Sequence, residues 1–288
     1  MNAPPENHPV ETIDFDARSL AIWLFDEPRN QTADETAGAT RESYGKGEQK
    51  ALDLIKSVAT EHGLETEIDE AANLIMTLPG SEPDRPSIAC GSHIDSVPQG
   101  GNYDGAAGVV AGLLCLARMR TQNIVPQRTI KLWALRGEES AWYGKSYIGS
   151  SALFGHLCAD DLAAAHRNGR RSLADALKSC GAAVDRIERG DQLLDPASIA
   201  VYLELHIEQS PVMVARDLPT AIVTGIRGCI RHRTIRCLGE TGHSGAAPRW
   251  LRRDALFTTA ELYHTPTGRL ASAPARRGDA GGGDRLEC

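Results

Sequence analysis

The sequence predicts an α/β fold, in which a largely parallel β-sheet is layered against helices. Short runs rich in β-branched residues alternate with helical stretches over the first 205 residues, and that alternation is typical of a parallel sheet. The chain has 288 residues, of which 41% are hydrophobic and 24% charged, the balance of an ordinary globular protein with one large or two smaller domains. The pattern changes after Pro211, so we expect a second, smaller α+β unit from about residue 214.

The first helix that the pattern predicts is amphipathic and covers residues 47–64. It ends at Gly63, a residue suited to a helix C-terminus. Its apolar positions recur at helical spacing: Ala51, Leu52, Leu54, Ile55, Val58 and Ala59. Short β-prone runs and then a helical run follow it along the chain: strands at 66–68, 74–78 and 87–90, and a helix at 106–119.

The next elements continue the alternation and then lead into the second unit. We expect a strand at 128–135, helices at 159–167 and 172–180, and a strand at 198–205. In the second unit we expect strands at 221–223 and 233–238 and a helix at 251–262. The last stretch, 264–288, is rich in Gly, Ala, Pro and Arg without a hydrophobic period, which predicts a disordered tail.

Charge and composition exclude several classes of partner. The net charge is −7 and the basic residues are scattered, so no basic stripe predicts a nucleic-acid partner. No window approaches the ~20 apolar residues of a membrane span, and the polar N-terminus has no signal-peptide pattern, so we expect a cytoplasmic protein. Seven cysteines without a C-x-x-C pair favour reduced thiols over disulfides or a thiolate zinc site.

Potential ligands follow three of the predicted strands. His93 and Asp95 come after the strand that ends at residue 90, and Glu138 and Glu139 come after the strand that ends near residue 135. His206 follows the strand at 198–205. Because the carboxyl ends of parallel strands meet in one crevice, we expect these side chains to lie close together.

A glycine-containing loop extends this set by one carboxylate. Asp104 lies eleven residues beyond His93, and the segment SVPQGGNY between them can fold back toward its start. Two imidazoles with carboxylates are the ligands expected for zinc, or for manganese or cobalt. In the adjacent pair, one carboxylate can hold metal while the other faces water, so we assign Glu139 as a ligand and Glu138 as a base. Taken singly, each motif remains open to a simpler interpretation as a turn or a solvated loop.

Four motifs in this order carry a family resemblance over about residues 41–263. They are GSHIDSVPQGGNYDGAAGVVAGL at 91–113, RGEESAWYGKSYIGSSALFG at 136–155, LELHIEQSPV at 203–212 and GETGHSGAAPRWLRRDAL at 239–256. Together they resemble the carbamoylase and allantoate amidohydrolase family, relatives of the dizinc aminoacylases and carboxypeptidases. The resemblance implies a three-layer α/β/α catalytic domain with a mixed, largely parallel sheet over 1–213, part of a lid or dimerisation domain over 214–263, and a tail outside the family pattern over 264–288.

The resemblance also implies a role for each candidate residue of a site for two divalent ions. His93, Asp104 and His206 would surround one ion, Asp104 would bridge to a second ion held by Glu139, and Asp95 would orient His93.

The implied reaction is hydrolysis of a ureido or amide group by a bridging water. Glu138 would deprotonate the water and then protonate the leaving nitrogen. Gln209 resembles the family's substrate-contacting glutamine, and His243 its lid histidine, which the partner subunit of a homodimer supplies. A histidine at position 206 favours the carbamoyl-cleaving branch, which acts on N-carbamoyl-L-amino acids, allantoate or ureidopropionate.

The end of the sequence departs from the family pattern. Family chains continue further and return to the catalytic layer with a last histidine for the second ion, whereas the match here stops near Tyr263. The comparison therefore implies a truncated or frame-shifted chain with a weakened second site and weak or no activity.

Two alternatives remain at this stage. The segment GHSGA at 242–246 resembles a nucleophile elbow, which would make Ser244 the nucleophile of a serine hydrolase. The chain could also be an inactive fragment that binds metal or dimerises without turnover.

Overall fold

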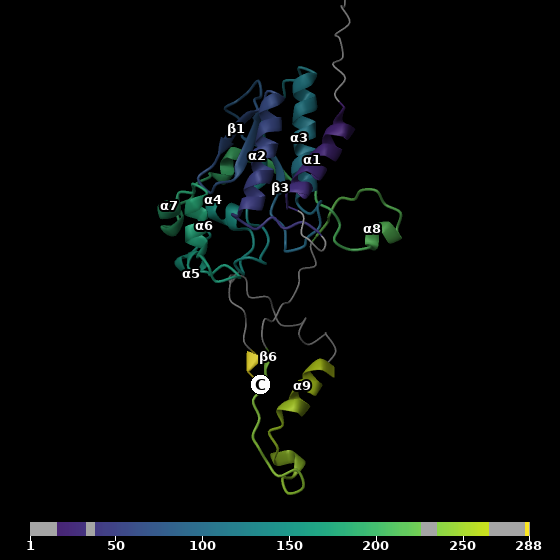
Figure 1. Cartoon of the computed structure of the whole chain (residues 1–288), viewed down its shortest axis with the longest axis vertical. Coiled ribbons are helices and arrows are strands. Elements are labelled where there is room, and N and C mark those ends of the chain that lie inside the picture. The colour runs from purple at the N-terminus through teal and green to yellow at the C-terminus, as the bar shows by residue number, and fades with distance from the viewer. Residues whose placement is uncertain (1–15, 33–37, 226–234, 265–285, 288) are drawn as a thin grey trace, which may run out of the picture. The chain divides into compact units, whose positions relative to one another are not determined.

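The structure is a computed structural model that describes residues 16–32, 38–225, 235–264 and 286–287. Its elements run along the chain in the following order (Figure 1): α1 (Ala17–Thr32), α2 (Lys46–Glu61), β1 (Glu65–Ile68), β2 (Leu74–Leu78), β3 (Ser87–His93), α3 (Ala106–Thr121), β4 (Ile130–Leu135), α4 (Ile148–Leu153), α5 (Ala159–Leu162), α6 (Leu173–Ser179), α7 (Val184–Glu188), β5 (Ile199–Leu203), α8 (Val212–Ala215), β6 (Ile235–Arg236), α9 (Ala255–His264) and β7 (Leu286–Glu287). Short 3₁₀ turns lie at Pro196–Ser198 and Arg249–Leu251. The chain divides into two compact units, Met1–Val212 and Met213–Cys288.

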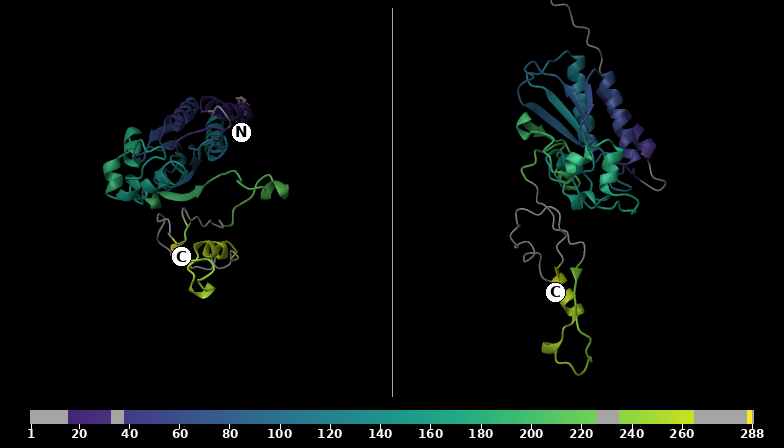
Figure 2. Two further views of the ribbon diagram at one scale, coloured as in Figure 1. Left: turned by 60° about the horizontal axis from the view of Figure 1, so that its bottom comes forward. Right: turned by 90° about the vertical axis from the view of Figure 1, so that its left-hand side faces the viewer.

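The first unit is built on a five-stranded mixed sheet in the order β1-β2-β4-β3-β5. Strands β3, β4 and β5 run parallel to one another, while β2 is antiparallel to both of its neighbours. Helices lie on both sides of this sheet, with α1, α2 and α3 together along one face (Figure 2). The α/β class, with a mixed sheet between helical layers, is therefore confirmed.

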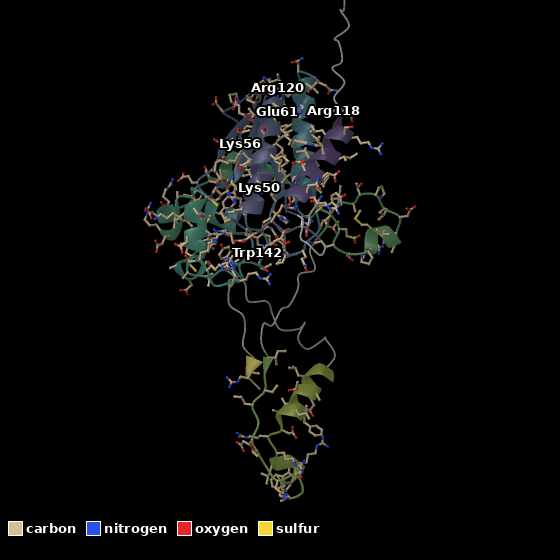
Figure 3. The ribbon with its side chains drawn as sticks, viewed as in Figure 1. Lys50, Lys56, Glu61, Arg118, Arg120 and Trp142 are labelled. Atoms are coloured by element: carbon tan, nitrogen blue, oxygen red, sulfur yellow. The ribbon has the colours of Figure 1, made fainter. Side chains whose placement is uncertain are left out.

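Two hydrophobic clusters hold the helices in place. The larger one joins α2 and α3 to the sheet through side chains such as Leu52, Ile55, Val109 and Leu113, each at most 2% exposed. Burying a side chain of this size contributes about 1.5–3 kcal/mol, so these helices are fixed mainly by their apolar faces. Most polar residues of the same helices lie outward, including those of α2 that Figure 3 labels, whereas Glu48 of α2 is buried. The second cluster packs α4, α6 and α7 around Ile148 and Leu177.

Most predicted elements of the first unit are present with small shifts at their ends. The amphipathic helix runs from Lys46 to Glu61, and Gly63 just beyond it has the left-handed φ of +72° expected of a terminating glycine. Strand β3 is longer than predicted and ends at His93 itself. The helix expected over 159–167 is wrong beyond Leu162, because the chain turns there and pairs Ala165 with Ser172 in an isolated bridge. The sequence reasoning missed four helices: α1, α4, α7 and α8.

The second unit contains little regular structure among its described residues. Residues 221–223 form no strand, so that prediction is wrong, and Ile222 and Val223 are 93% and 75% exposed. Ile235–Arg236 pairs in parallel with Leu286–Glu287, and the rest of the predicted tail, 265–285 and 288, lies outside the described residues. The assignment of 1–213, 214–263 and 264–288 as catalytic domain, lid and tail stays a prediction.

Among the described residues, no helix has the length and apolar character that crossing a membrane requires.

Candidate metal centre

The register of the parallel strands brings the two predicted histidines to one edge of the sheet. Cys90 of β3 pairs with Leu132 of β4 on one side and with Leu203 of β5 on the other. His93 and His206 each lie three residues beyond this aligned row, so both reach the carboxyl edge of the sheet. The pairing of backbone strands therefore explains why residues 113 positions apart meet.

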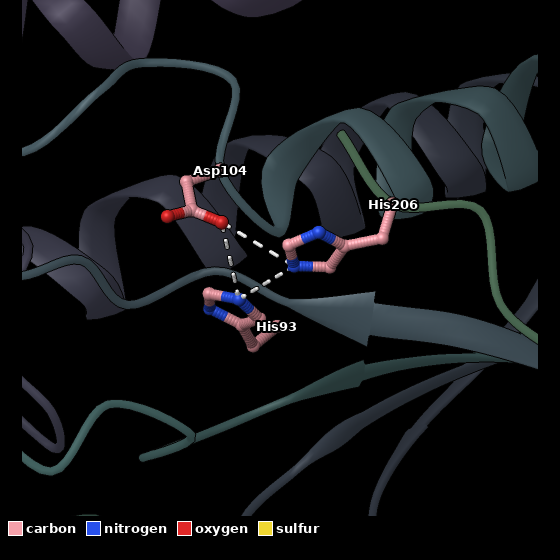
Figure 4. Close-up of side chains that lie close together, drawn as sticks. All are labelled: His93, Asp104 and His206. Atoms are coloured by element: carbon pink, nitrogen blue, oxygen red, sulfur yellow. Dashed lines mark hydrogen bonds and ion pairs between the residues drawn. The ribbon is translucent and has the colours of Figure 1, made fainter. Parts of the chain in front are cut away.

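Three predicted ligands converge at this edge (Figure 4). Nε2 of His206 lies 3.3 Å from Oδ1 of Asp104 and 3.5 Å from Nε2 of His93. Nε2 of His93 lies 3.8 Å from the same Asp104 oxygen. One potential ligand atom from each residue thus lies within 4.8 Å of the other two, a separation that one cation can span. Among the described residues, this is the one group of three or more His, Cys, Asp or Glu side chains whose potential ligand atoms lie this close together.

The polar groups in this triad fit a cation. Oδ1 of Asp104 is buried and accepts no hydrogen bond, although it faces two imidazole nitrogens. A buried carboxylate oxygen without a partner is unfavourable, and a divalent ion bound between the three side chains would satisfy it. Two nitrogens and one oxygen form a ligand set that suits zinc or manganese. Their role as ligands stays a prediction.

Buried Arg41 fixes the loop that returns Asp104 to His93. Its Nε donates to the carbonyl oxygen of Ile94 at 2.7 Å, and its Nη1 donates to Oδ1 of Asn102 at 3.2 Å. Arg41 therefore ties the start of the loop to its end, and Asp104 comes directly before the N-cap Gly105 of α3. The sequence reasoning missed Arg41 because a single arginine before the first predicted helix belongs to no recognisable motif.

Asp95 sets the orientation of His93. Nδ1 of His93 donates to the backbone carbonyl of Asp95 at 2.9 Å and lies 3.4 Å from its carboxylate, which leaves Nε2 facing Asp104. Burial by itself lowers the pKa of His93, but the carboxylates of Asp95 and Glu138 outweigh it and raise the pKa to about 9. Burial by itself raises the pKa of Asp95, yet hydrogen bonds from His93, Ser43 and the backbone of Glu139 hold that pKa below the ordinary value. A charged Asp95 is consistent with the predicted orienting role.

Asp95 also holds the pair of glutamates after β4. The backbone N–H of Glu138 donates to Oδ1 of Asp95 at 3.1 Å, and that of Glu139 donates to Oδ2 at 3.0 Å. Oε2 of Glu138 then lies 3.8 Å from Nε2 of His93. Burial, with the neighbouring charge of Glu138, raises the pKa of Glu139 to about 7, and burial also raises the pKa of Glu138. Glu138 thus lies beside His93 of the triad, and the raised pKa of each glutamate makes it accept a proton more readily than an ordinary carboxylate.

Gln209 lies beside Asp104. Its Nε2 donates to Oδ2 of Asp104 at 2.7 Å, so in this structure the amide contacts the carboxylate of a predicted ligand. A substrate-contacting role, as the resemblance implies, stays a prediction.

His243 and Ser244 lie in the second unit, which is described by itself. Nδ1 of His243 accepts a hydrogen bond from the backbone N–H of Gly245 at 3.2 Å, within a turn. A nucleophile elbow requires a strand directly before the serine and a helix directly after it. Within residues 235–264 the preceding strand ends at Arg236 and a 3₁₀ turn begins at Arg249, so Ser244 lacks that context.

Known proteins resemble this chain in sequence. The family described as Peptidase family M28 matches residues 73–168. An N-carbamoyl-L-amino acid amidohydrolase of Geobacillus stearothermophilus is 37% identical over 227 residues, which are 79% of this chain and 54% of the relative. An allantoate amidohydrolase of Escherichia coli is 32% identical over 232 residues, 81% of this chain and 55% of the relative. The chain spans about half the length of these curated relatives.

A solved structure shares the fold. A hydantoinase/carbamoylase family amidase from Burkholderia ambifaria superposes with a TM-score of 0.69 at 26% identity, covering 90% of this chain and 61% of the amidase. These similarities confirm the family resemblance that the four motifs predict.

Proposed function

Because the chain is a homologue of the carbamoylases and allantoate amidohydrolases, we propose that it is the metal-binding part of a hydrolase that cleaves a linear C–N bond of a ureido or amide compound. The convergence of His93, Asp104 and His206, with a buried Asp104 oxygen that lacks a hydrogen bond, is the observation that carries this proposal. N-carbamoyl-L-amino acids, allantoate and ureidopropionate are the substrate candidates.

The donor set favours divalent zinc or manganese, with His93, Asp104 and His206 around a first ion. Glu139 would share a second ion with Asp104, as the resemblance implies, at a site that has fewer protein ligands. When bound, such ions acidify water and polarise the scissile carbonyl. The remaining chemistry falls to side chains of this chain.

Glu138 is the proton carrier of the proposed reaction. It is half-buried beside His93, and its raised pKa suits a group that accepts a proton from the attacking water and then donates it to the leaving nitrogen. Asp95 keeps Nδ1 of His93 engaged, so that Nε2 remains directed at the metal position. Gln209, next to Asp104, is placed to contact a substrate beside the carboxylate.

The assembly and location of the protein are part of the proposal. His243 would act from the second unit of a partner subunit in a homodimer, as the resemblance implies. A cytoplasmic location agrees with the cysteine pattern, which favours reduced thiols.

The test is hydrolysis by the purified full chain. After loading with zinc or manganese, bound metal is measured, and ammonia release is followed with N-carbamoyl-L-amino acids and allantoate. Glu138→Gln should reduce kcat by about 10²–10⁴-fold while bound metal stays within twofold of the parent protein. Glu61→Gln, on the exposed face of α2, is the matched control and should leave both unchanged. Turnover by the metal-free chain would refute the proposal, and metal binding without any turnover would favour a metal-binding fragment.

A further inference from the structure

Four consecutive backbone N–H groups lead from the end of β4 into the glutamate pair, and each donates to a buried side chain. The N–H of Arg136 donates to Oδ1 of Asn73 at 2.9 Å, and the N–H of Gly137 donates to Oε1 of Glu48 at 3.2 Å. The next two, from residues 138 and 139, go to Asp95 as described above. We call Asn73, Glu48 and Asp95 the cradle; all three are 0% exposed.

The carbonyl side of the same loop is held separately. The carbonyls of residues 136, 137 and 138 accept from the backbone N–H groups of Gly149, Ile148 and Tyr147 at 3.0, 2.8 and 3.1 Å. The loop is therefore held by two sets of hydrogen bonds, and the cradle accepts those from its N–H groups. Removing one cradle oxygen removes a bond of the first set and leaves the bonds to the carbonyls intact.

Glu48 is the member of the cradle whose carboxylate is buried in an ion pair with Arg136. It lies in the first turn of α2, and its Oε2 accepts from the backbone N–H of Tyr44 and from Nε of buried Arg136, both at 2.7 Å. Nη1 of Arg136 donates onward to Oε1 of Gln49 at 2.9 Å. Burial raises the pKa of Glu48 to about 7 even though Arg136 lowers it, which shows how strongly this carboxylate is desolvated. A buried ion pair usually contributes less stability than packed apolar side chains of the same size, so stability alone does not account for the Glu48–Arg136 pair.

We propose that Glu48 is a positioning residue for the Glu138–Glu139 pair. It acts through the backbone of Gly137 and the side chain of Arg136, and so sets the direction in which the two carboxylates leave the loop. This inference rests on the proposed function for the roles of the glutamates, but the hold of Glu48 on the loop can be tested without metal or substrate.

Glu48→Gln isolates the bond to Gly137. The amide has the same shape as the carboxylate but only one oxygen, and that oxygen is favoured at the Oε2 position, where two short bonds end. The NH₂ group then faces the N–H of Gly137, and because both groups are donors, the hydrogen bond from Gly137 is lost. The variant thus removes one contact of the cradle and leaves the volume of the site unchanged.

The first measurement is amide hydrogen exchange in the metal-free full chain. In Glu48→Gln we expect the amides of residues 136–139 to exchange at least tenfold faster, while those of β4 and the rest of α2 stay within threefold of the parent protein. Glu61→Gln is the matched control, since Glu61 lies at the exposed end of the same helix and its side chain accepts a hydrogen bond from Ser57 (Figure 3). Unchanged exchange over 136–139 would overturn the proposal.

The second measurement separates positioning from general damage. Cobalt titration, followed by its absorption spectrum, should show an unchanged first ion at the triad and a second ion bound about 10–100-fold more weakly in Glu48→Gln. The kcat for a ureido substrate should fall while KM changes less than threefold. Equal weakening of both ions would indicate a loosened fold and would also overturn the proposal. If the parent protein neither binds cobalt nor turns over, the proposed function fails, and the exchange result still decides whether Glu48 holds the loop.

A double variant addresses the charge that Glu48→Gln leaves behind. Arg136→Met removes the uncompensated guanidinium but keeps the backbone N–H of residue 136, so the double variant Glu48→Gln/Arg136→Met should fold even if the single variant does not. We expect it to keep the fast exchange at 136–139. If the double variant regains slow amide exchange at 136–139 and the parent affinity for the second cobalt ion, Glu48 serves only to neutralise Arg136, and the proposal is contradicted.

Discussion

Replacing Gly105 by alanine tests whether the position of His93 decides metal affinity. Gly105 is the N-cap of α3 and has a φ of +63°, a region that favours glycine. A Cβ added there would lie 2.5 Å from three atoms of the His93 ring, namely Cγ, Cδ2 and Nδ1. The change therefore adds one methyl group that presses on the imidazole itself.

The size of the effect follows from these contacts. The ring must retreat by about 1 Å to restore a normal carbon contact of ~3.5 Å. His93 is 2% exposed and bonded to the Asp95 carbonyl at 2.9 Å, so the ring has little room to retreat without breaking that bond. Metal–ligand distances tolerate only about 0.2 Å, so we expect a loss in affinity of at least 10–100-fold. Backbone strain and overpacking together should lower the free energy of unfolding by about 2–5 kcal/mol.

The assay compares Gly105→Ala with Gly101→Ala. Gly101 lies in the same loop, and a Cβ added there meets no atom within 4 Å, so its alanine variant controls for the substitution itself. Zinc affinity is measured by competition with a chromophoric chelator, and stability by urea unfolding of the metal-free chain. If Gly105→Ala folds and binds zinc within threefold of Gly101→Ala, the inferred dependence of the metal centre on the His93 position is refuted.

The remaining predictions concern other parts of the same centre. Gly108→Ala places a Cβ against the carbonyl oxygen of Leu205 and 2.7 Å from Cβ of Ser92, so it should displace His206 and weaken zinc binding about tenfold in a calorimetric titration; unchanged affinity would contradict this. Because the pKa of His93 is raised to about 9, zinc must displace a proton, and affinity should rise about tenfold per pH unit up to pH 9; a flat profile from pH 7 to 9 would exclude that proton. The same raised pKa stabilises the metal-free fold fully below pH 6.5, and this stability should be lost in urea titrations as pH rises through 9. Chelation of bound metal should lower Tm, since saturation at 100 times Kd contributes about 2.7 kcal/mol.

The sequence was informative where function depends on the ends of strands. The meeting of His93 and His206 could be predicted because parallel strands end at one edge, and the register of Cys90 with Leu203 agrees with that prediction. Asp104 could be added because a glycine-containing loop can return it to His93. The amphipathic helix α2 could likewise be predicted, since the spacing of apolar residues within one segment determines which of its faces is buried.

The sequence was less informative where the outcome depends on distant neighbours. The strand predicted over 198–205 is present as β5, but its exposure could not be predicted: β5 pairs only with β3 at the edge of the described sheet, and Leu203 is 58% exposed. The cradle residues Glu48 and Asn73 were missed because their partners lie 89 and 63 residues away and the residue types are common. Such contacts leave no local pattern in a single sequence.

Asp95 connects the two halves of the proposed centre. One carboxylate fixes the imidazole of His93 and also accepts the backbone N–H groups of Glu138 and Glu139. A displacement of the Asp95 carboxylate should therefore affect both His93 and the glutamate loop. All of these groups, with Asp104, lie within the first compact unit. It follows that binding of the first ion should depend on that unit's own sheet and on Asp95.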